Sequence, residues 1–370
     1  MKAGYFSPLP PARTGVADYA ASLLDELRRH GTVEIAPGPC DVALYHIGNN
    51  PLHADIYRRA LSRPGVVLLH DAALNHFHLG QLSEAQYVDE FVYNYGEWNR
   101  ELGRRLWRER AGSASDERYF RYAMLRRIAE SARAVVVHNP AAAAIVGEHA
   151  PQARILEIPH LYAPPTLPDE ASVLRYRHSL GIHPGVFLFG VFGYLRESKR
   201  VVSVLEAYRA LRRTVPHAGL LLAGDFVSTD LERAIAPALR EPGVYRLPYL
   251  SESEFWLAAR ATDACINLRY PAAGESSGIA VRLMGLGKPV LMTEGPETVR
   301  IPEDACLRIP HGPGERDALW HYMVLLTSVA DVAGEIGRRV ADHIAAHHRV
   351  DRIGKQFWDV LCECSLQQVA

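Results

Sequence analysis

Short apolar strands alternate with helical segments along most of this chain, and that alternation limits its possible folds more than any other feature. Several strands are apolar at every position, as in Val66–Leu69 and Ala134–Val137. Continuous apolar strands are typical of parallel sheets whose two faces are both covered by helices. The sequence therefore predicts an α/β fold with parallel sheets.

A proline-rich polar segment near the middle of the chain, YAPPTLPDE at 162–170, interrupts the alternation, which restarts at 186–192. Breaks of this kind mark domain boundaries, and 370 residues are enough for two cores. We expect two Rossmann-like domains that face each other across a cleft. The first covers 1–165 and the second covers 166–349.

The composition argues against several functional classes. A formal net charge of -1 gives no general attraction to nucleic acid. No apolar run approaches the length that spans a bilayer, and the N-terminus lacks the apolar segment of a signal peptide. The five cysteines are scattered, so we expect free thiols in a reducing cytoplasm.

One local charge feature is the segment from Glu101 to Arg133, which holds more arginines than acids. It has two interpretations: the solvated face of a helical region, or contact with an anionic acceptor or a membrane surface. The second interpretation predicts peripheral contact, at most, with the inner face of a membrane.

The stretch from Arg269 to Met292 combines a strand, a small-residue turn and a helix. The turn is Gly274-Glu275-Ser276-Ser277-Gly278, and Gly287 ends the helix that follows it. The first N–H groups of a helix have no intrahelical partner, so this arrangement predicts an anion site. A carboxylate at Glu275 is unexpected beside an anion, and the hydroxyl groups of a sugar are suitable partners for it.

A second strand–turn–helix unit is GYLRESKR at 193–200, where Arg196 and Lys199 could hold a diphosphate. It lacks the pattern of a P-loop, and the alternative is a charged helix N-terminus on the surface. Gly15 stands in a similar place after the first strand. It could be a turn residue, or it could let the backbone approach a ligand closely. The chain has no Asp-x-Asp pair, so no metal site is suggested.

Polar residues follow several predicted strands: His70-Asp71, His138-Asn139 and His160. The carboxyl edge of an open α/β sheet is where ligands bind. His70-Asp71 could bind an acceptor hydroxyl, or could be a helix cap with a packed imidazole. The same two interpretations apply to a second group of residues around a predicted turn: His46, Asn49, Asn50 and His53.

The turn at 274–278 also fits G-x-S-x-G, the nucleophile elbow of α/β-hydrolases. Ser276 would then be the nucleophile, with Asp304 and His311 available as acid and base. Three extra residues, 271–273, separate the predicted strand from the turn, whereas an elbow needs its serine at the strand end. That interpretation also leaves the lysine loop at 193–200 without a role.

In order and spacing, five motifs resemble the family 4 retaining glycosyltransferases, which have the GT-B fold. The motifs are FSPLPPARTGVADY at the N-terminus, LLHD at 68–71, GVFGYLRESKR at 190–200, LLLAGD at 220–225 and GESSGIAVRLMGLGKPVL at 274–291. The resemblance covers nearly the whole chain and includes bacterial members with a GETSG-like loop, often found with polysaccharide synthesis. It implies transfer of a sugar from a nucleotide-diphosphate sugar to a saccharide or glycolipid acceptor, with no metal or separate cofactor.

The resemblance also implies where the donor phosphates bind. The second domain is expected to hold the donor and the first the acceptor, with the C-terminal helix, within 350–370, packed back on the first domain. Lys199 and Arg196 match the cations on the donor diphosphate. Ser276, Ser277 and Gly278 match the loop and helix start beside the phosphate.

Other residues match the sugar and acceptor side of the family's site. Glu275 matches a carboxylate that contacts the donor sugar, and His70 matches a cleft histidine; with Lys199 they form the expected catalytic set. Gly15 matches a glycine loop near the donor. Arg282 stands where the family usually has a ribose-binding glutamate, and Tyr194 stands where many members have arginine. These departures leave open a homologue that binds nucleotide sugars without turnover.

Overall fold

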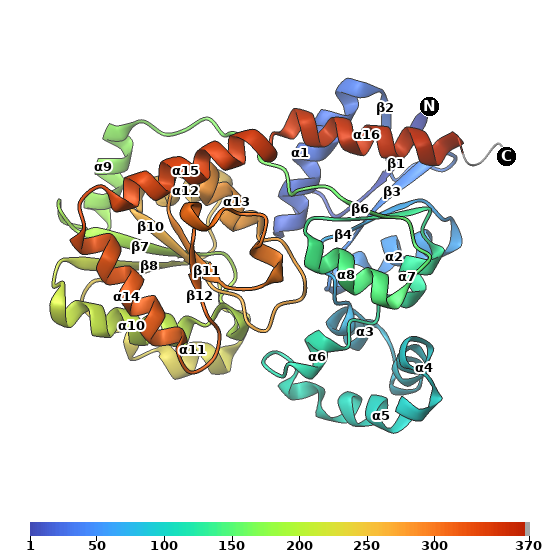
Figure 1. Cartoon of the computed structure of the whole chain (residues 1–370), viewed down its shortest axis with the longest axis horizontal. Coiled ribbons are helices and arrows are strands. Elements are labelled where there is room, and N and C mark those ends of the chain that lie inside the picture. Colours follow the sequence, from blue (N-terminus) through green and yellow to red (C-terminus); the bar gives the residue numbers. More distant parts are fainter. Residues whose placement is uncertain (367–370) are drawn as a thin grey trace. The chain divides into compact units, whose positions relative to one another are not determined.

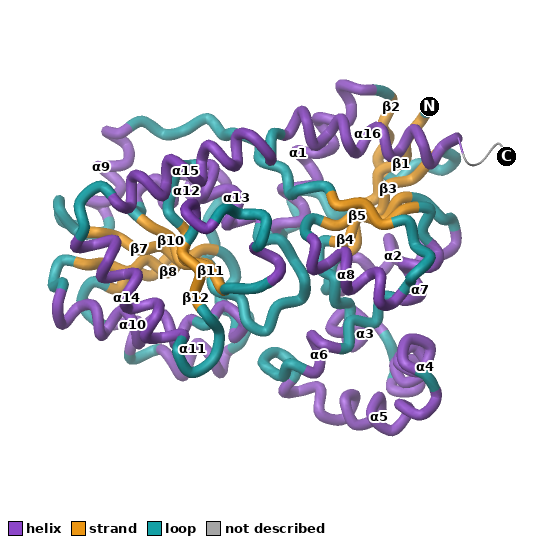
Figure 2. Tube along the Cα trace, viewed as in Figure 1, coloured by secondary structure: helices purple, strands orange, loops and turns teal. Residues whose placement is uncertain are grey.

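Two six-stranded parallel sheets organise the chain (Figures 1 and 2). The computed structural model describes residues 1–366, which divide into two units. Unit 1 consists of Met1–Ala163, Pro271–Gly278 and the described part of His348–Ala370, and unit 2 of Pro164–Tyr270 and Ile279–His347. The loop Pro271–Gly278 therefore groups with unit 1, although it lies within 166–349 in the sequence. The last four residues of the predicted C-terminal segment, 367–370, lie outside the described residues.

The sheet of unit 1 has the order β2-β1-β3-β4-β5-β6, with every neighbouring pair parallel. Its strands are β1 (Lys2–Phe6), β2 (Thr32–Ile35), β3 (Val42–Ile47), β4 (Val66–Leu69), β5 (Ala134–Val137) and β6 (Ile155–Glu157). The central strands β4 and β5 are buried at every position, as their continuous apolar sequences predict. Strand β2 was not predicted, because it lies at the sheet edge and is mostly exposed, with no apolar run.

Helices cover the sheet of unit 1 and extend from it. They are α1 (Gly15–His30), α2 (Ala54–Ser62), α3 (Asn75–Gln81), α4 (Glu84–Tyr95), α5 (Arg100–Glu109), α6 (Arg118–Arg121), α7 (Arg126–Ser131), α8 (Pro140–His149) and α16 (Val350–Leu366). Helix α16 lies along α1 and shares its core through Phe357 and Leu361 (Figure 1). A side chain at Gly31, where α1 ends, would meet the ring of Trp358 at 2.3 Å.

The segment between β4 and β5 is helical, as predicted, and helices α4 to α6 build a small core of their own. Tyr87, Phe91, Leu106 and Tyr119 are fully buried in it. A capping box between Ser83 and Gln86 starts α4. Aromatic side chains bury a large area each, which allows these short helices to hold together outside the main sheet.

The sheet of unit 2 has the order β12-β11-β10-β7-β8-β9 and is also parallel. Its strands are β7 (Phe187–Phe192), β8 (Ala218–Ala223), β9 (Val244–Leu247), β10 (Ala264–Asn267), β11 (Val290–Thr293) and β12 (Leu307–Ile309). The helices are α9 (Glu170–Ser179), α10 (Val201–Thr214), α11 (Thr229–Ile235), α12 (Glu252–Ala261), α13 (Gly278–Gly285), α14 (Glu315–Ser328) and α15 (Val332–His347).

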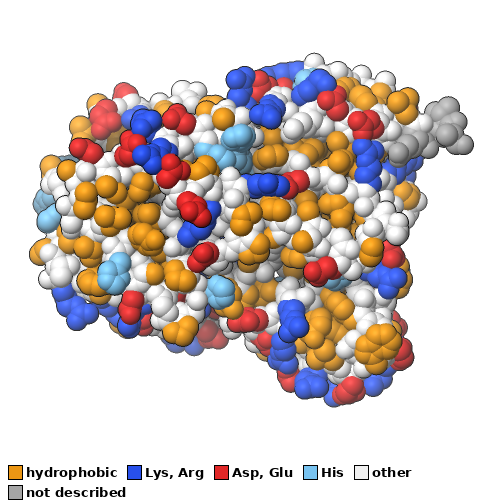
Figure 3. All heavy atoms as spheres, in the orientation of Figure 1, with side chains coloured by type: hydrophobic (Ala, Val, Ile, Leu, Met, Phe, Trp, Pro, Cys, Tyr) orange, Lys and Arg blue, Asp and Glu red, His pale blue; other side chains and the backbone are white. Residues whose placement is uncertain are grey.

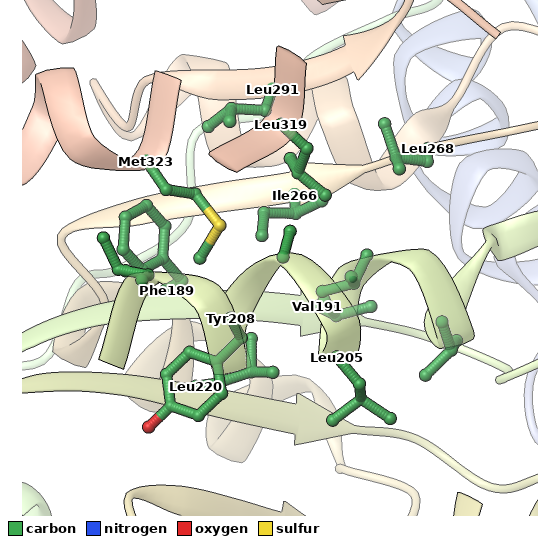
Figure 4. Close-up of a cluster of buried hydrophobic side chains, with 14 of the residues drawn as sticks. Phe189, Val191, Leu205, Tyr208, Leu220, Ile266, Leu268, Leu291, Leu319 and Met323 are labelled. Atoms are coloured by element: carbon green, nitrogen blue, oxygen red, sulfur yellow. The ribbon is translucent and has the colours of Figure 1, made fainter. Parts of the chain in front are cut away.

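The core of unit 2 lies between its sheet and the helices α10 and α14. Tyr208 from α10 and Met323 from α14 lie in the same buried cluster as Phe189 and Ile266 from the central strands (Figure 4). Each of these side chains is almost completely removed from solvent. Within the described part of the chain, no helix is both long and apolar enough to cross a membrane.

Candidate functional site

Three cationic side chains gather at the carboxyl end of β7 in unit 2. Lys199 lies in a short 3-10 turn, Glu197–Lys199, between β7 and α10, and only 5% of it is exposed. Its Nζ donates a hydrogen bond to the carbonyl of Phe192. Burial lowers the pKa of Lys199 well below its usual value, and the nearby charges of Arg269 and Arg196 lower it further.

Arg269 is the member of this group that the sequence did not single out. It follows strand β10 and belongs to the segment that the backbone ties to the lysine turn, because Tyr270 N donates to Ser198 O at 2.8 Å. Arg269 N donates to Thr293 Oγ1 at 2.9 Å, which fixes the segment to the end of β11. The available signal was its position at the carboxyl end of an apolar strand, where ligands of α/β sheets bind.

Two glycines let the lysine turn pass close to the sheet. Gly193 has a φ of +81°, and a side chain there would meet the Ile279 side chain at 2.4 Å. Gly224 has a φ of +141°, and a Cβ there would lie 2.2 Å from Gly193 O. Both positions need glycine for conformation and for space. Gly224 of the LLLAGD motif thus supports the loop that carries Lys199.

The surroundings of Lys199 point to an anion. Within the described residues Lys199 forms no ion pair with a carboxylate, and its one hydrogen-bond acceptor is a carbonyl. A buried ammonium group without a counter-ion is strongly unfavourable, and neighbouring arginines make it more so. The sequence left open that this turn is a charged helix terminus on the surface. That alternative does not fit Lys199, which is buried, although Arg196 is exposed. A diphosphate would supply the missing negative charge.

Arg282 lies on α13 with a different set of partners. Its guanidinium donates to Glu252 Oε2 at 2.6 Å. It also lies over the rings of Phe255 and Trp256, 4.0 and 4.4 Å from their centroids. Trp256 Nε1 donates to the other oxygen of Glu252 at 2.6 Å. Arg282 is therefore held by α12 within unit 2.

The loop Pro271–Gly278 is fixed to unit 1 by its backbone. Ala72 N donates to Ala273 O at 2.7 Å, which places the loop beside the segment that follows β4. Asn139 Nδ2 donates to Gly274 O at 2.9 Å and to Ser276 Oγ at 3.0 Å. Glu275 Oε2 accepts from Ala273 N at 2.7 Å, so one carboxylate oxygen faces its own loop.

The nucleophile-elbow interpretation fails on this geometry. Strand β10 ends at Asn267 and α13 begins at Gly278, so Ser276 is not at a strand end. Its hydroxyl is bonded to an amide, and among the described residues no imidazole is hydrogen-bonded to it. An activated serine needs a base within hydrogen-bond reach.

His70 lies in a group of histidines at the carboxyl edge of the unit 1 sheet. Its Nε2 is 3.0 Å from Nδ1 of His46, and its ring centroid is 5.7 Å from that of His138. His138 in turn contacts His160, whose Nε2 would lie 2.8 Å from a Cβ at Gly278. These four histidines thus form one group, and His160 places it beside the end of the loop that carries Glu275.

Gly15 is the first residue of α1, and Thr14 caps that helix by accepting from Ala17 N. A Cβ at Gly15 would have no atom within 4 Å, and its φ is not positive. The fold itself therefore does not require glycine there. One turn later on the same helix, Tyr19 lies among the histidines.

The arginine-rich segment is largely neutralised by acids, some of which come from outside it. Its ion pairs include Arg104–Glu101, Arg108–Glu84, Arg118–Asp116, Arg126–Glu130 and Arg127–Glu90. Basic and acidic side chains are interspersed over the lobe of α4 to α6 (Figure 3). This pattern favours the solvated helical face.

No protein-family model matches the sequence, and no curated protein does either. Solved structures match the fold along almost the whole chain. Sucrose-phosphate synthase from Thermosynechococcus elongatus matches with a TM-score of 0.68, at 15% identity, over 100% of both chains. HepE from Anabaena in complex with UDP-glucose has a TM-score of 0.65 at 15% identity, over 98% of this chain and 100% of that one.

WaaG, a glycosyltransferase involved in lipopolysaccharide biosynthesis, has a TM-score of 0.64 at 15% identity, over 97% of this chain and 99% of its own. The chain has the GT-B fold. The predicted fold class is confirmed by two parallel Rossmann-like sheets that match those of the GT-B structures. At this identity the similarity shows the fold, and roles for individual residues remain predictions.

Proposed function

We propose that this protein is a retaining glycosyltransferase that moves a sugar from a nucleotide-diphosphate sugar to a hydroxyl of a saccharide or glycolipid acceptor. The observation that carries the proposal is the buried side chain of Lys199, which lies near Arg196 and Arg269. Among the described residues Lys199 forms no ion pair. These cations would bind the donor diphosphate, and would also stabilise the charge that develops as it leaves.

The proposed chemistry is stabilisation of a leaving group. The bond between the anomeric carbon and the phosphate oxygen breaks, and the nucleoside diphosphate leaves with the electron pair. The acceptor hydroxyl attacks from the face of the departing phosphate, which takes the hydroxyl proton, so the anomeric configuration is retained. The cations are positioned before the reaction, which supplies electrostatic stabilisation without a metal ion.

The other predicted site residues have supporting roles in this proposal. Glu275 would bind hydroxyls of the donor sugar, and His70 would bind the sugar or the acceptor. The backbone amides of Ser276, Ser277 and Gly278 would face the phosphate. Gly15 would let the backbone of α1 approach the donor, and Arg282 would contact the nucleotide.

The solved structures suggest which donors to test first. HepE was solved with UDP-glucose, and WaaG belongs to lipopolysaccharide biosynthesis. UDP-sugars are therefore the first donors to try, and polysaccharide or glycoconjugate synthesis in the cytoplasm is the proposed setting. Any membrane contact would be peripheral, at the inner face.

The test is a panel of nucleotide sugars measured by thermal shift and then by donor hydrolysis and transfer. A bound donor stabilises the folded state by about 2.7 kcal/mol at a hundred times its Kd. Lys199→Ala should lose this stabilisation and the transfer activity while remaining folded. Lys288→Ala is the matched control, because Lys288 is a partly buried lysine of unit 2 whose Nζ donates to carbonyls of Arg260 and Thr262. It should lower stability and leave the donor-dependent shift in place.

Near-normal turnover in Lys199→Ala would contradict the proposal. The second candidate is a protein that binds nucleotide sugars without turnover, which is favoured by the engagement of Arg282 with Glu252. A Lys199-dependent thermal shift with neither hydrolysis nor transfer, across acceptors, would decide for it.

A further inference from the structure

Four neighbouring strands of unit 1 each contribute a histidine to one edge of the sheet. His46 lies near the end of β3, and His70, His138 and His160 follow β4, β5 and β6. Tyr19 from α1 lies among them, with its ring centroid 6.1, 5.1, 5.2 and 4.6 Å from those of the four imidazoles, in that order. We call these five side chains the histidine cluster.

His46, Tyr19 and His138 are the deeply buried members of the cluster, and burial keeps the imidazoles of His46, His70 and His138 uncharged. His46 is fully buried, and Tyr19 and His138 are 4% and 6% exposed. Burial is the main reason that the pKa of His46 and of His70 lies well below the usual value, and that of His138 falls to about 4. Each of these imidazoles therefore carries one ring proton at neutral pH, and the position of that proton decides what it can donate.

Two histidines, His138 of the cluster and the neighbouring His53, have a ring-proton position that the backbone sets. His53 Nδ1 is 2.8 Å from the carbonyl oxygen of His46, and His138 Nδ1 is 2.9 Å from that of Ile158. A carbonyl only accepts, so both rings are protonated at Nδ1. In both, Nε2 is then a lone pair, and both Nε2 atoms are buried without a hydrogen-bond partner. Such bare lone pairs are more readily tolerated than bare N–H groups.

The same reasoning applies to the pair formed by His46 and His70. His46 Nδ1 is 3.0 Å from His70 Nε2, and His46 Nε2 is buried without a partner. If His70 donated, His46 would carry its proton on Nε2 as a buried, unsatisfied N–H. If His46 donates from Nδ1, its Nε2 is only a bare lone pair. The second arrangement is favoured, and it puts the proton of His70 on Nδ1.

We propose that His46 is a positioning residue that fixes the ring orientation and the tautomer of His70, so that His70 presents Nδ1–H as a hydrogen-bond donor. His53 in turn donates from Nδ1 to the backbone carbonyl of His46 and so fixes the backbone of His46. His70 Nδ1 is not among the buried atoms without a partner, and His70 is only partly buried. His70 would thus donate to an oxygen of the sugar or acceptor and would not act as a base through Nε2. That role at the substrate rests on the proposed glycosyl transfer.

The tautomer can be read without any substrate. Ring-nitrogen NMR spectra of the full chain labelled with ¹⁵N-histidine distinguish Nδ1–H from Nε2–H, and the His70→Asn variant assigns the signals of His70. We expect His70 in the Nδ1–H form in the wild type. A wild-type His70 in the Nε2–H form would overturn the proposal, whatever the protein catalyses.

A pair of variants separates positioning from packing. His46→Asn can still donate an N–H toward His70 Nε2, whereas His46→Leu fills the fully buried site and cannot donate. Packing alone predicts that the leucine variant is at least as stable and as active as the asparagine variant. We expect the reverse for activity: His46→Asn keeps kcat within about threefold, and His46→Leu loses roughly tenfold with an unchanged donor Kd, the effect of one hydrogen bond.

Equal kcat values in the two variants would overturn the positioning role. A different result would reject the proposed function. If no nucleotide sugar gives transfer with the wild-type protein, glycosyl transfer is rejected, while the ring-nitrogen spectra still decide the tautomer of His70.

Discussion

The guanidinium of Arg282 donates to the carboxylate of Glu252 at 2.6 Å, across from one helix to another. The same carboxylate accepts from Trp256, and the guanidinium lies over the rings of Phe255 and Trp256. Arg282 is therefore matched by acceptors and aromatic faces on α12. A glutamate at 282 would face Glu252 with like charge, so the charges at these two positions depend on each other.

Removing this arginine should destabilise unit 2 modestly. Arg282→Ala should lower the free energy of unfolding by roughly 1–2 kcal/mol, since it loses two cation–π contacts and a largely buried hydrogen-bonded guanidinium. Glu252→Gln, with Glu252 60% exposed, should lower it by less than about 1 kcal/mol. Urea unfolding of both single variants and the double variant measures their coupling. Arg233→Ala, in the exposed pair with Asp230, is the control and should change stability by at most ~0.5 kcal/mol. Additive effects of the two substitutions would show that the pair contributes nothing.

Donor binding should be linked to protonation of Lys199. In the free protein, burial and the charges of Arg269 and Arg196 lower the pKa of Lys199, and a bound diphosphate would raise it again. At pH values above the pKa that Lys199 has in the free protein, binding then takes up a proton, and donor affinity decreases as pH rises through that pKa. Calorimetry in buffers of different ionisation enthalpy measures the uptake.

Two lysine variants make that experiment specific. Lys199→Met should remove the proton uptake and weaken donor binding. Lys288→Met, at the partly buried lysine of unit 2, should keep the uptake of the wild type. Equal uptake in the wild type and in Lys199→Met would assign the proton to another group.

A methyl group at position 224 should displace Gly193 and, with it, the turn that carries Lys199. Its Cβ would lie 2.2 Å from Gly193 O, at a φ of +141° that side chains rarely adopt. Gly224→Ala should therefore destabilise by roughly 1–3 kcal/mol and weaken donor binding, because the loop that leads to Lys199 has to move. Gly334→Ala, on α15 with no atom within 4 Å of the new Cβ, should be neutral or stabilising by up to ~1 kcal/mol. Thermal unfolding and donor titration check both, and an unperturbed Gly224→Ala would contradict the steric argument.

The pattern of residues along the chain predicted most of the helices and strands, because the features that determine them are local in sequence. Continuous apolar strands such as Ala134–Val137 and glycine stops such as Gly287 identify elements without tertiary information. The edge strand Thr32–Ile35 was missed, since only its pairing with β1 makes it a strand. The motif identifies Lys199 but does not show that it is buried, because burial depends on tertiary contacts such as that of Tyr270 N with Ser198 O.

The histidine cluster shows why the rest of the site was not predictable. His46 and His70 are 24 positions apart, and their hydrogen bond follows from the register of β3 beside β4, where His46 is opposite Leu68. Tyr19 has the spacing of an ordinary core residue on α1, and its contacts with four histidines come from the order of strands in the sheet. In a parallel sheet the connections between strands vary widely in length, so the separation of two residues along the chain does not show whether they meet.

The buried histidines should make the fold sensitive to mild acid, and His53 tests this most directly. Burial lowers its pKa to about 4 in the folded state, below about 6.5 for an unfolded chain. Its stabilising effect is complete above about pH 6.5 and is lost as pH falls toward 4, because the unfolded chain binds the proton first. His53→Asn cannot titrate, yet its amide can still donate to His46 O, the bond that His53 Nδ1 makes at 2.8 Å. Between pH 6 and pH 5, the free energy of unfolding of the wild type should fall more steeply than that of His53→Asn, by up to about 1.4 kcal/mol per pH unit. Urea unfolding across this range measures the slopes, with His183→Asn, which removes an exposed imidazole, as the control that should follow the wild type. Identical slopes for the wild type and His53→Asn would show that His53 is not held neutral by burial.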